Sequence, residues 1–98
     1  DRTLVYSGDT APCEQLVAAS RGADLALFEA SYLERNDNPP NLHLTGADAA
    51  KLATEAGVDR LVLTHLVPWN DVDEVRADAA AHFTGDLNVA FAGMTLTV

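Results

Sequence analysis

Short apolar runs that end beside a polar, metal-capable side chain recur along this chain, with helix-like stretches between them. Each run is expected to form a buried strand: residues 3–6, 24–28 and 60–64. Shortly after these runs come Asp9, Glu29 and His65. Because the carboxyl ends of parallel strands meet at one edge of an α/β sheet, we expect these three side chains to lie together there.

Helix signals occupy the intervening segments. A first helix is predicted for residues 12–21, with a proline suited to its first turn and Gly22 placed to end it. Thr45 followed by Asp48 is a capping signature for a second helix, which Gly57 ends. Asp71 with Glu74 caps a third. The apolar positions of the last two helices repeat every three or four residues: Ala49, Leu52, Ala53 and Ala56, then Val72, Val75, Ala79 and Phe83.

The remaining segments complete the pattern of one α/β domain, or part of one, over residues 1–98. Residues 34–41 are polar and contain two prolines, which predicts a loop. Residues 87–91 and 94–97 read as a closing pair of strands turned at Ala92 and Gly93. The expected fold class is therefore α/β, with a mixed sheet and about three helices.

Charge and composition exclude several kinds of function. Six basic against fifteen acidic residues give a net charge of −9, which disfavours extensive contact with nucleic acid. No apolar run approaches the roughly 20 residues that span a bilayer, so no membrane association is expected. The single cysteine, Cys13, cannot form an internal disulfide, and a cytoplasmic setting is the expectation.

Four residues could carry chemistry, and three of them also have a structural interpretation. Asp9 could cap the following helix or bridge two cations. His65 could be a hydrogen-bonded structural residue or a metal ligand. His43 could be a loop histidine near a helix cap or a proton donor, with Glu29 orienting its imidazole. Nucleotide binding lacks support, because the chain has neither a GxGxxG pattern nor a P-loop lysine.

Four short motifs occur in this order along the chain: Ser7-Gly8-Asp9-Thr10, Leu27-Phe28-Glu29-Ala30-Ser31, His43-Leu44-Thr45 and Leu63-Thr64-His65. Together they resemble the C-terminal half of a metallo-β-lactamase-fold hydrolase, closest to the ribonuclease Z-like branch. The resemblance implies a four-layered αββα sandwich of two similar halves. It also implies two zinc ions per full-length chain, with manganese or iron as alternatives.

The resemblance assigns a role to each candidate residue. Asp9 resembles the carboxylate that bridges both metals, and His65 resembles the histidine that completes the second metal's ligands. Glu29 and His43 resemble the pair that protonates the leaving oxygen after a metal-activated hydroxide attacks phosphorus. The implied reaction is metal-dependent hydrolysis of a phosphodiester or similar ester.

This chain also departs from the family pattern. The HxHxDH cluster that supplies most ligands of the first metal does not occur in residues 1–98, so we expect them to be the C-terminal half of a longer enzyme and inactive alone. After His65 the chain has Leu66-Val67-Pro68-Trp69-Asn70 instead of an Arg-Tyr pair, which disfavours tRNA cleavage. The alternative is a non-catalytic domain for assembly or partner binding. Because an isolated half would expose the sheet face that the other half covers, we also expect residues 1–98 to associate with a second copy or with the missing half.

Overall fold

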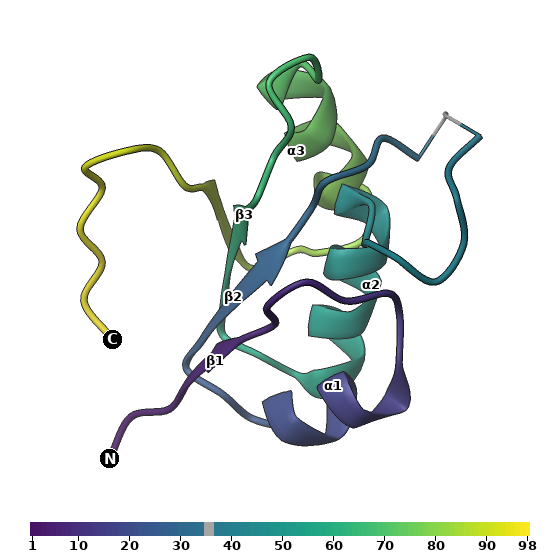
Figure 1. Ribbon diagram of the computed structural model, residues 1–98. Helices are drawn as coiled ribbons and strands as arrows, with labels where there is room; N and C mark the ends of the chain where they lie inside the picture. The colour runs from purple at the N-terminus through teal and green to yellow at the C-terminus, as the bar shows by residue number, and fades with distance from the viewer. Residues whose placement is uncertain (35–36) are drawn as a thin grey trace.

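The computed structural model describes residues 1–34 and 37–98 (Figure 1). Its elements follow the chain in strict alternation: β1 (Leu4–Tyr6), α1 (Glu14–Ser20), β2 (Leu25–Glu29), α2 (Gly46–Ala56), β3 (Arg60–Thr64), α3 (Val72–Ala80) and β4 (Asp86–Val89). The four strands form one sheet in the order β1-β2-β3-β4, and every neighbouring pair is parallel. Figure 1 shows the three helices on one side of this sheet and the C-terminal segment on the other.

The strand register brings the carboxyl ends of the first three strands to one edge. Tyr6 of β1 is paired with Leu27, and Glu29 at the end of β2 is paired with Thr64 of β3. The chain therefore leaves β1 toward Asp9, and leaves β3 directly into His65, at the edge where Glu29 ends β2. This is the placement that the alternation of strands and helices predicts.

Local signals determine the helix ends. The Thr45 side chain accepts a hydrogen bond from the Asp48 backbone N–H at 2.9 Å, and the Asp48 carboxylate accepts one from the Thr45 N–H at 3.1 Å. Gly57 ends α2 with a φ of 71°, which a residue without a side chain adopts at little cost. The predicted capping box and stop of this helix are thus both confirmed.

The other two helices differ slightly from expectation. The first begins at Glu14 rather than at Pro12, with Cys13 as its N-cap. At α3 the Asp71 carboxylate accepts a hydrogen bond from the Asp73 N–H. Val72 lies before the buried side chains of this helix and is 45% exposed. Its exposure corrects the prediction that it is one of them.

The hydrophobic core lies between the helices and the sheet. Fully buried side chains of the sheet pack against an alanine-rich face of α2: Ala26, Phe28, Leu61 and Leu63 against Ala49, Ala50 and Ala53. Small side chains let the helix lie close to its neighbours. At Gly46, the start of α2, an added Cβ would lie only 2.6 Å from the Val75 carbonyl oxygen of α3.

A carboxylate links the start of β1 to the start of β2. Asp24, just before β2, accepts a hydrogen bond from the Thr3 backbone N–H at 2.7 Å. This bond, with Arg2 nearby, holds the pKa of Asp24 below its ordinary value. The contact fixes the start of β1 against the start of β2.

The first strand of the predicted closing pair is present, although it ends at Val89 rather than at Phe91, and the second strand is wrong. Residues 86–89 form β4 and pair in parallel with β3, and residues 90–98 form no strand in the described structure. The turn itself is present, since the Met94 N–H donates to the Phe91 carbonyl oxygen at 3.0 Å. Beyond it the chain returns across the sheet, where the Arg60 guanidinium donates to the Thr97 carbonyl oxygen at 2.6 Å. The described sheet is therefore parallel rather than mixed, although the α/β class and the three helices are confirmed.

Two further predictions concern loops and membranes. Within the predicted loop 34–41, Arg35 and Asn36 lie outside the described residues, and the described remainder forms no helix or strand. No helix among the described residues is long and apolar enough to cross a bilayer.

Candidate metal centre

Three metal-capable side chains converge at the carboxyl edge of the sheet. Asp9, His43 and His65 each offer one ligand atom, and these atoms lie within 4.8 Å of one another. The His65 Nε2 atom is 3.7 Å from an Asp9 carboxylate oxygen. His43 comes from the segment that joins β2 to α2, and its ring centroid is 5.5 Å from that of His65. The topology thus gathers residues that are far apart in the sequence.

Two of these side chains, Asp9 and His65, fit a zinc-like cation. Carboxylate oxygen and imidazole nitrogen bind zinc at about 2.0–2.2 Å, so two atoms that share one ion are at most about 4.3 Å apart. The Asp9–His65 separation of 3.7 Å meets that limit without any backbone movement. The site is also open to solvent on one side, because Asp9 and His65 are both exposed.

A buried carboxylate organises the same edge. Glu29 has 0% of its surface exposed, yet its carboxylate accepts hydrogen bonds from three donors. These are the Thr10 backbone N–H at 2.6 Å, the Ser31 hydroxyl at 2.9 Å and His43 Nδ1 at 3.0 Å. A buried charge with this many partners is stably accommodated.

The contact with Glu29 determines the proton position on His43. A carboxylate only accepts hydrogen bonds, so Nδ1 of His43 carries the proton and donates it. Tyr32 packs edge-on against the ring at a centroid distance of 5.2 Å, which fixes its orientation further. The Nε2 atom of His43 is therefore the one left for a ligand or a substrate.

His65 has an unusual backbone for a residue with a side chain. Its φ is 58°, in the left-handed region that non-glycine residues rarely adopt. The Ser31 hydroxyl lies 2.7 Å from His65 Nδ1 and 2.9 Å from the His65 carbonyl oxygen. One buried serine thus contacts both the side chain and the backbone of this residue.

Sequence reasoning missed the residues that support this edge. Ser31, which is 1% exposed, is one of these supporting residues. Ser7 is another, and its hydroxyl accepts a hydrogen bond from the Glu29 N–H at 3.0 Å. Asn70 donates to the Ser31 carbonyl oxygen at 3.0 Å. One feature of the sequence could have indicated the role of Ser31: it follows Glu29 by two positions, and an extended chain places such residues on the same side.

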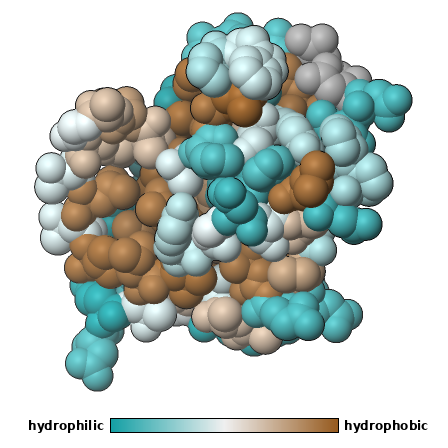
Figure 2. All heavy atoms as spheres, viewed as in Figure 1, coloured by the Kyte–Doolittle hydropathy of each residue, from teal (hydrophilic) through white to brown (hydrophobic). Residues whose placement is uncertain are grey.

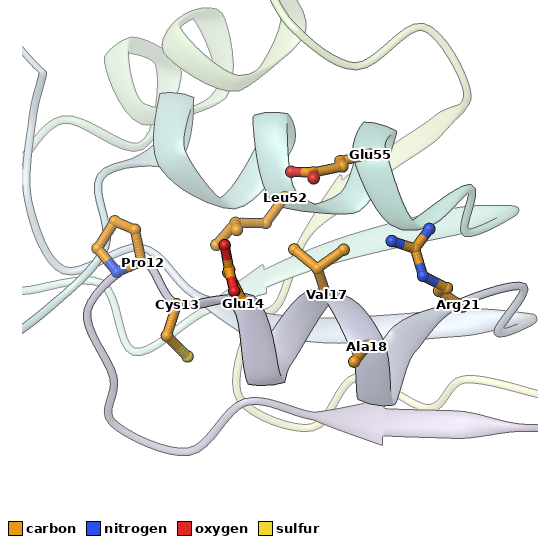
Figure 3. Close-up of a pocket in the computed structure, with 8 residues that line it drawn as sticks. All are labelled: Pro12, Cys13, Glu14, Val17, Ala18, Arg21, Leu52 and Glu55. Carbon is orange, nitrogen blue, oxygen red and sulfur yellow. The ribbon is translucent and has the colours of Figure 1, made fainter.

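A second hollow lies apart from these residues. A groove of about 520 Å³ runs between α1 and α2, as Figure 3 shows, and the following residues line it: Pro12, Cys13, Glu14, Val17, Ala18, Arg21, Leu52 and Glu55. Its lining mixes aliphatic side chains with charges of both signs. None of the converging residues borders it, so it does not belong to the metal-capable cluster.

Comparisons with known proteins agree with this fold. A family model described as "Beta-lactamase superfamily domain" matches residues 1–66. An uncharacterised protein of Mycobacterium leprae is 46% identical over 98% of this chain and 34% of its own length. A ribonuclease Z of Myxococcus xanthus is 41% identical over 97% of this chain and 32% of its own length.

A solved structure extends the comparison to three dimensions. The metallo-beta-lactamase fold protein YhfI from Bacillus subtilis matches with a TM-score of 0.90 and 31% identity, over 96% of this chain and 39% of that one. The parallel sheet with its three helices therefore forms part of a metallo-β-lactamase fold. The chain belongs to the beta-lactamase superfamily, and its ribonuclease Z-like character is confirmed. It spans about a third of the length of the curated relatives it matches.

Proposed function

We propose that the full-length protein containing these residues is a metal-dependent hydrolase, and that this segment supplies one side of its active site. The observation that carries the proposal is the convergence of Asp9, His43 and His65 around the buried Glu29 carboxylate. Relatives called ribonuclease Z support hydrolysis as the reaction class. A non-catalytic role in assembly is not favoured, because such a role gives no reason for this donor set to be gathered and open to solvent.

Asp9 and His65 are the residues that would hold the metal, with zinc the best match to a carboxylate and an imidazole. When bound, a pair of such ions would activate water and neutralise charge on the scissile group. The remaining ligands would come from the part of the protein outside residues 1–98. That division agrees with a half-domain whose sheet face is covered by the missing half.

His43 would act on the proton of the leaving group. Its Nδ1 proton is held by Glu29, so Nε2 is free to carry and release a second proton at the solvent-facing side of the ring. The neighbouring carboxylate stabilises the positive imidazolium that this requires. Glu29 and His43 together therefore form a proton-transfer pair.

The charge of the residues around His43 affects which substrates would bind. A hollow of about 540 Å³ beside it is lined partly by Glu34, Asp37 and Asp48. Together with the net charge of −9, this lining would repel a polyanion. A small phosphodiester, or another ester with an uncharged leaving group, is therefore proposed in preference to RNA.

A hydrolysis assay with matched histidine variants tests the proposal. Zinc-loaded full-length protein is given bis(p-nitrophenyl) phosphate and p-nitrophenyl acetate, and His43→Gln is compared with His82→Gln, which changes an exposed histidine outside the site. We expect turnover by the wild type, a loss of about 10²–10⁴-fold in kcat for His43→Gln, and no change for His82→Gln. No turnover of either ester, or equal rates for both variants, would contradict the proposal.

A further inference from the structure

We propose that Ser31 is a positioning residue of the metal centre: its hydroxyl selects the tautomer of His65 in which Nε2 is unprotonated and faces Asp9. The proposal rests on the proposed function only in taking His65 as a metal ligand. It assigns Ser31, which lies 34 residues before His65, a role that depends on the fold.

The Ser31 hydroxyl lies within hydrogen-bond distance of three groups. The oxygen lies 2.7 Å from His65 Nδ1, 2.9 Å from a Glu29 carboxylate oxygen and 2.9 Å from the His65 carbonyl oxygen. Ser31 is 1% exposed, so water does not compete for these contacts. One hydroxyl group, with a single proton, thus faces three possible partners.

The Ser31 hydroxyl cannot donate to all of its neighbours. A hydroxyl has one proton to donate, and the Glu29 carboxylate and the His65 carbonyl oxygen can only accept. A hydrogen bond to an ionised acceptor is roughly twice as strong as a neutral one, so the proton is directed to Glu29. The lone pairs of the hydroxyl oxygen then need a donor, and Nδ1–H of His65 is the group within reach.

The proton on Nδ1 of His65 determines the state of its other ring nitrogen, Nε2. A neutral imidazole carries one proton, so protonation at Nδ1 leaves Nε2 with a free lone pair. Nε2 is the atom that lies 3.7 Å from Asp9. A metal ligand needs this lone pair, and a partner for the other nitrogen is the usual means of holding it in place.

The Ser31 hydroxyl also helps to hold the backbone conformation of His65. With a φ of 58°, this residue stays in the left-handed region only if its surroundings hold it there. The hydrogen bond from its own Nδ1–H to the buried Ser31 hydroxyl, at 2.7 Å, is one such restraint. Ring orientation and backbone conformation of the ligand thus depend on one serine.

The chain offers a matched control for this experiment. Ser20 in α1 is also a fully buried serine, and its hydroxyl has no hydrogen-bond partner among the described residues. Ser31→Ala and Ser20→Ala therefore remove the same atom from equally buried sites. Ser31→Thr retains the hydroxyl and should restore the function of the site.

The test has two readouts, both made on the full-length protein. In the metal-free wild type at about pH 8.5, where an ordinary histidine is neutral, long-range proton–nitrogen NMR with labelled histidine reports which ring nitrogen carries the proton. The His65 signal is assigned from its loss in His65→Gln. We expect the Nδ1–H form in the wild type and in Ser31→Thr, and a shift toward the Nε2–H form in Ser31→Ala.

The second readout is zinc affinity by competition with a chromophoric chelator. Loss of an outer partner of a metal-bound histidine typically weakens binding about 10–100-fold, which is the expectation for Ser31→Ala. Ser20→Ala and Ser31→Thr should bind like the wild type. An Nε2–H form of His65 in the wild type, or unchanged affinity in a folded Ser31→Ala, would overturn the proposal. Tight zinc binding without ester hydrolysis would instead count against the proposed function alone.

Discussion

At the scale of single residues, Glu29 is the group on which the site depends. Its carboxylate joins the loop that carries Asp9, through the Thr10 N–H, to His43 directly and to His65 through Ser31. One buried charge therefore aligns the three metal-capable segments. The sequence predicts the pairing of Glu29 with His43, but it does not reveal the contacts with Thr10 and Ser31, because these depend on how the strands are aligned.

Replacement of Glu29 by Gln is expected to destabilise the protein. The amide offers one accepting oxygen and adds two N–H donors, whereas the three groups that face it are all donors. Unsatisfied buried donors cost about 1–3 kcal/mol in the free energy of unfolding. Urea unfolding of the full-length protein measures this, with Glu55→Gln on the exposed face of α2 as the control. Equal stability of the two variants would show that the Glu29 contacts contribute little.

At the scale of elements, the sequence predicts best what is locally determined. Arg60–Thr64 is the strand that the apolar run indicates, and Thr45, Asp48 and Gly57 bound α2 as their residue types suggest. The closing strand at residues 94–97 fails for a tertiary reason. Its alternating pattern suits a strand, but the chain returns over the sheet face, where Arg60 binds the Thr97 carbonyl oxygen, instead of extending the sheet beyond β4.

The junction of α2 with α3 gives a prediction at this scale. Gly46→Ala would place a Cβ 2.6 Å from the Val75 carbonyl oxygen, so the two helices must move apart. The expected cost is about 1–3 kcal/mol in the free energy of unfolding, although alanine favours helices. Gly57→Ala provides the comparison, because its Cβ meets open space and the cost comes from a φ of 71° alone, about 1 kcal/mol. A Gly46→Ala protein that is more stable than the wild type would refute the steric argument.

At the scale of the whole molecule, one face of the sheet is incompletely covered. Leu4 and Tyr6 lie on the same side of β1 with 52% and 62% of their surfaces exposed, and Phe91 beyond β4 is 68% exposed. Figure 2 shows hydrophobic side chains gathered on this part of the molecule. A patch of this kind favours association. Dimerisation of isolated residues 1–98, or their binding to the missing half, therefore stays a prediction, as does a cytoplasmic setting. Monomeric sedimentation of the isolated segment would contradict the first.

The central claim is that Asp9 and His65 belong to a metal centre completed by the rest of the protein. Elemental analysis of the full-length protein tests it most directly, with wild type, Asp9→Ala and the exposed-site control Asp59→Ala compared after identical zinc loading and desalting. We expect about two zinc ions per chain in the wild type and in Asp59→Ala, and a clear loss in Asp9→Ala, because that variant lacks one of the two ligands that this segment would supply. No bound metal in the wild type, or undiminished metal in Asp9→Ala, would contradict the account.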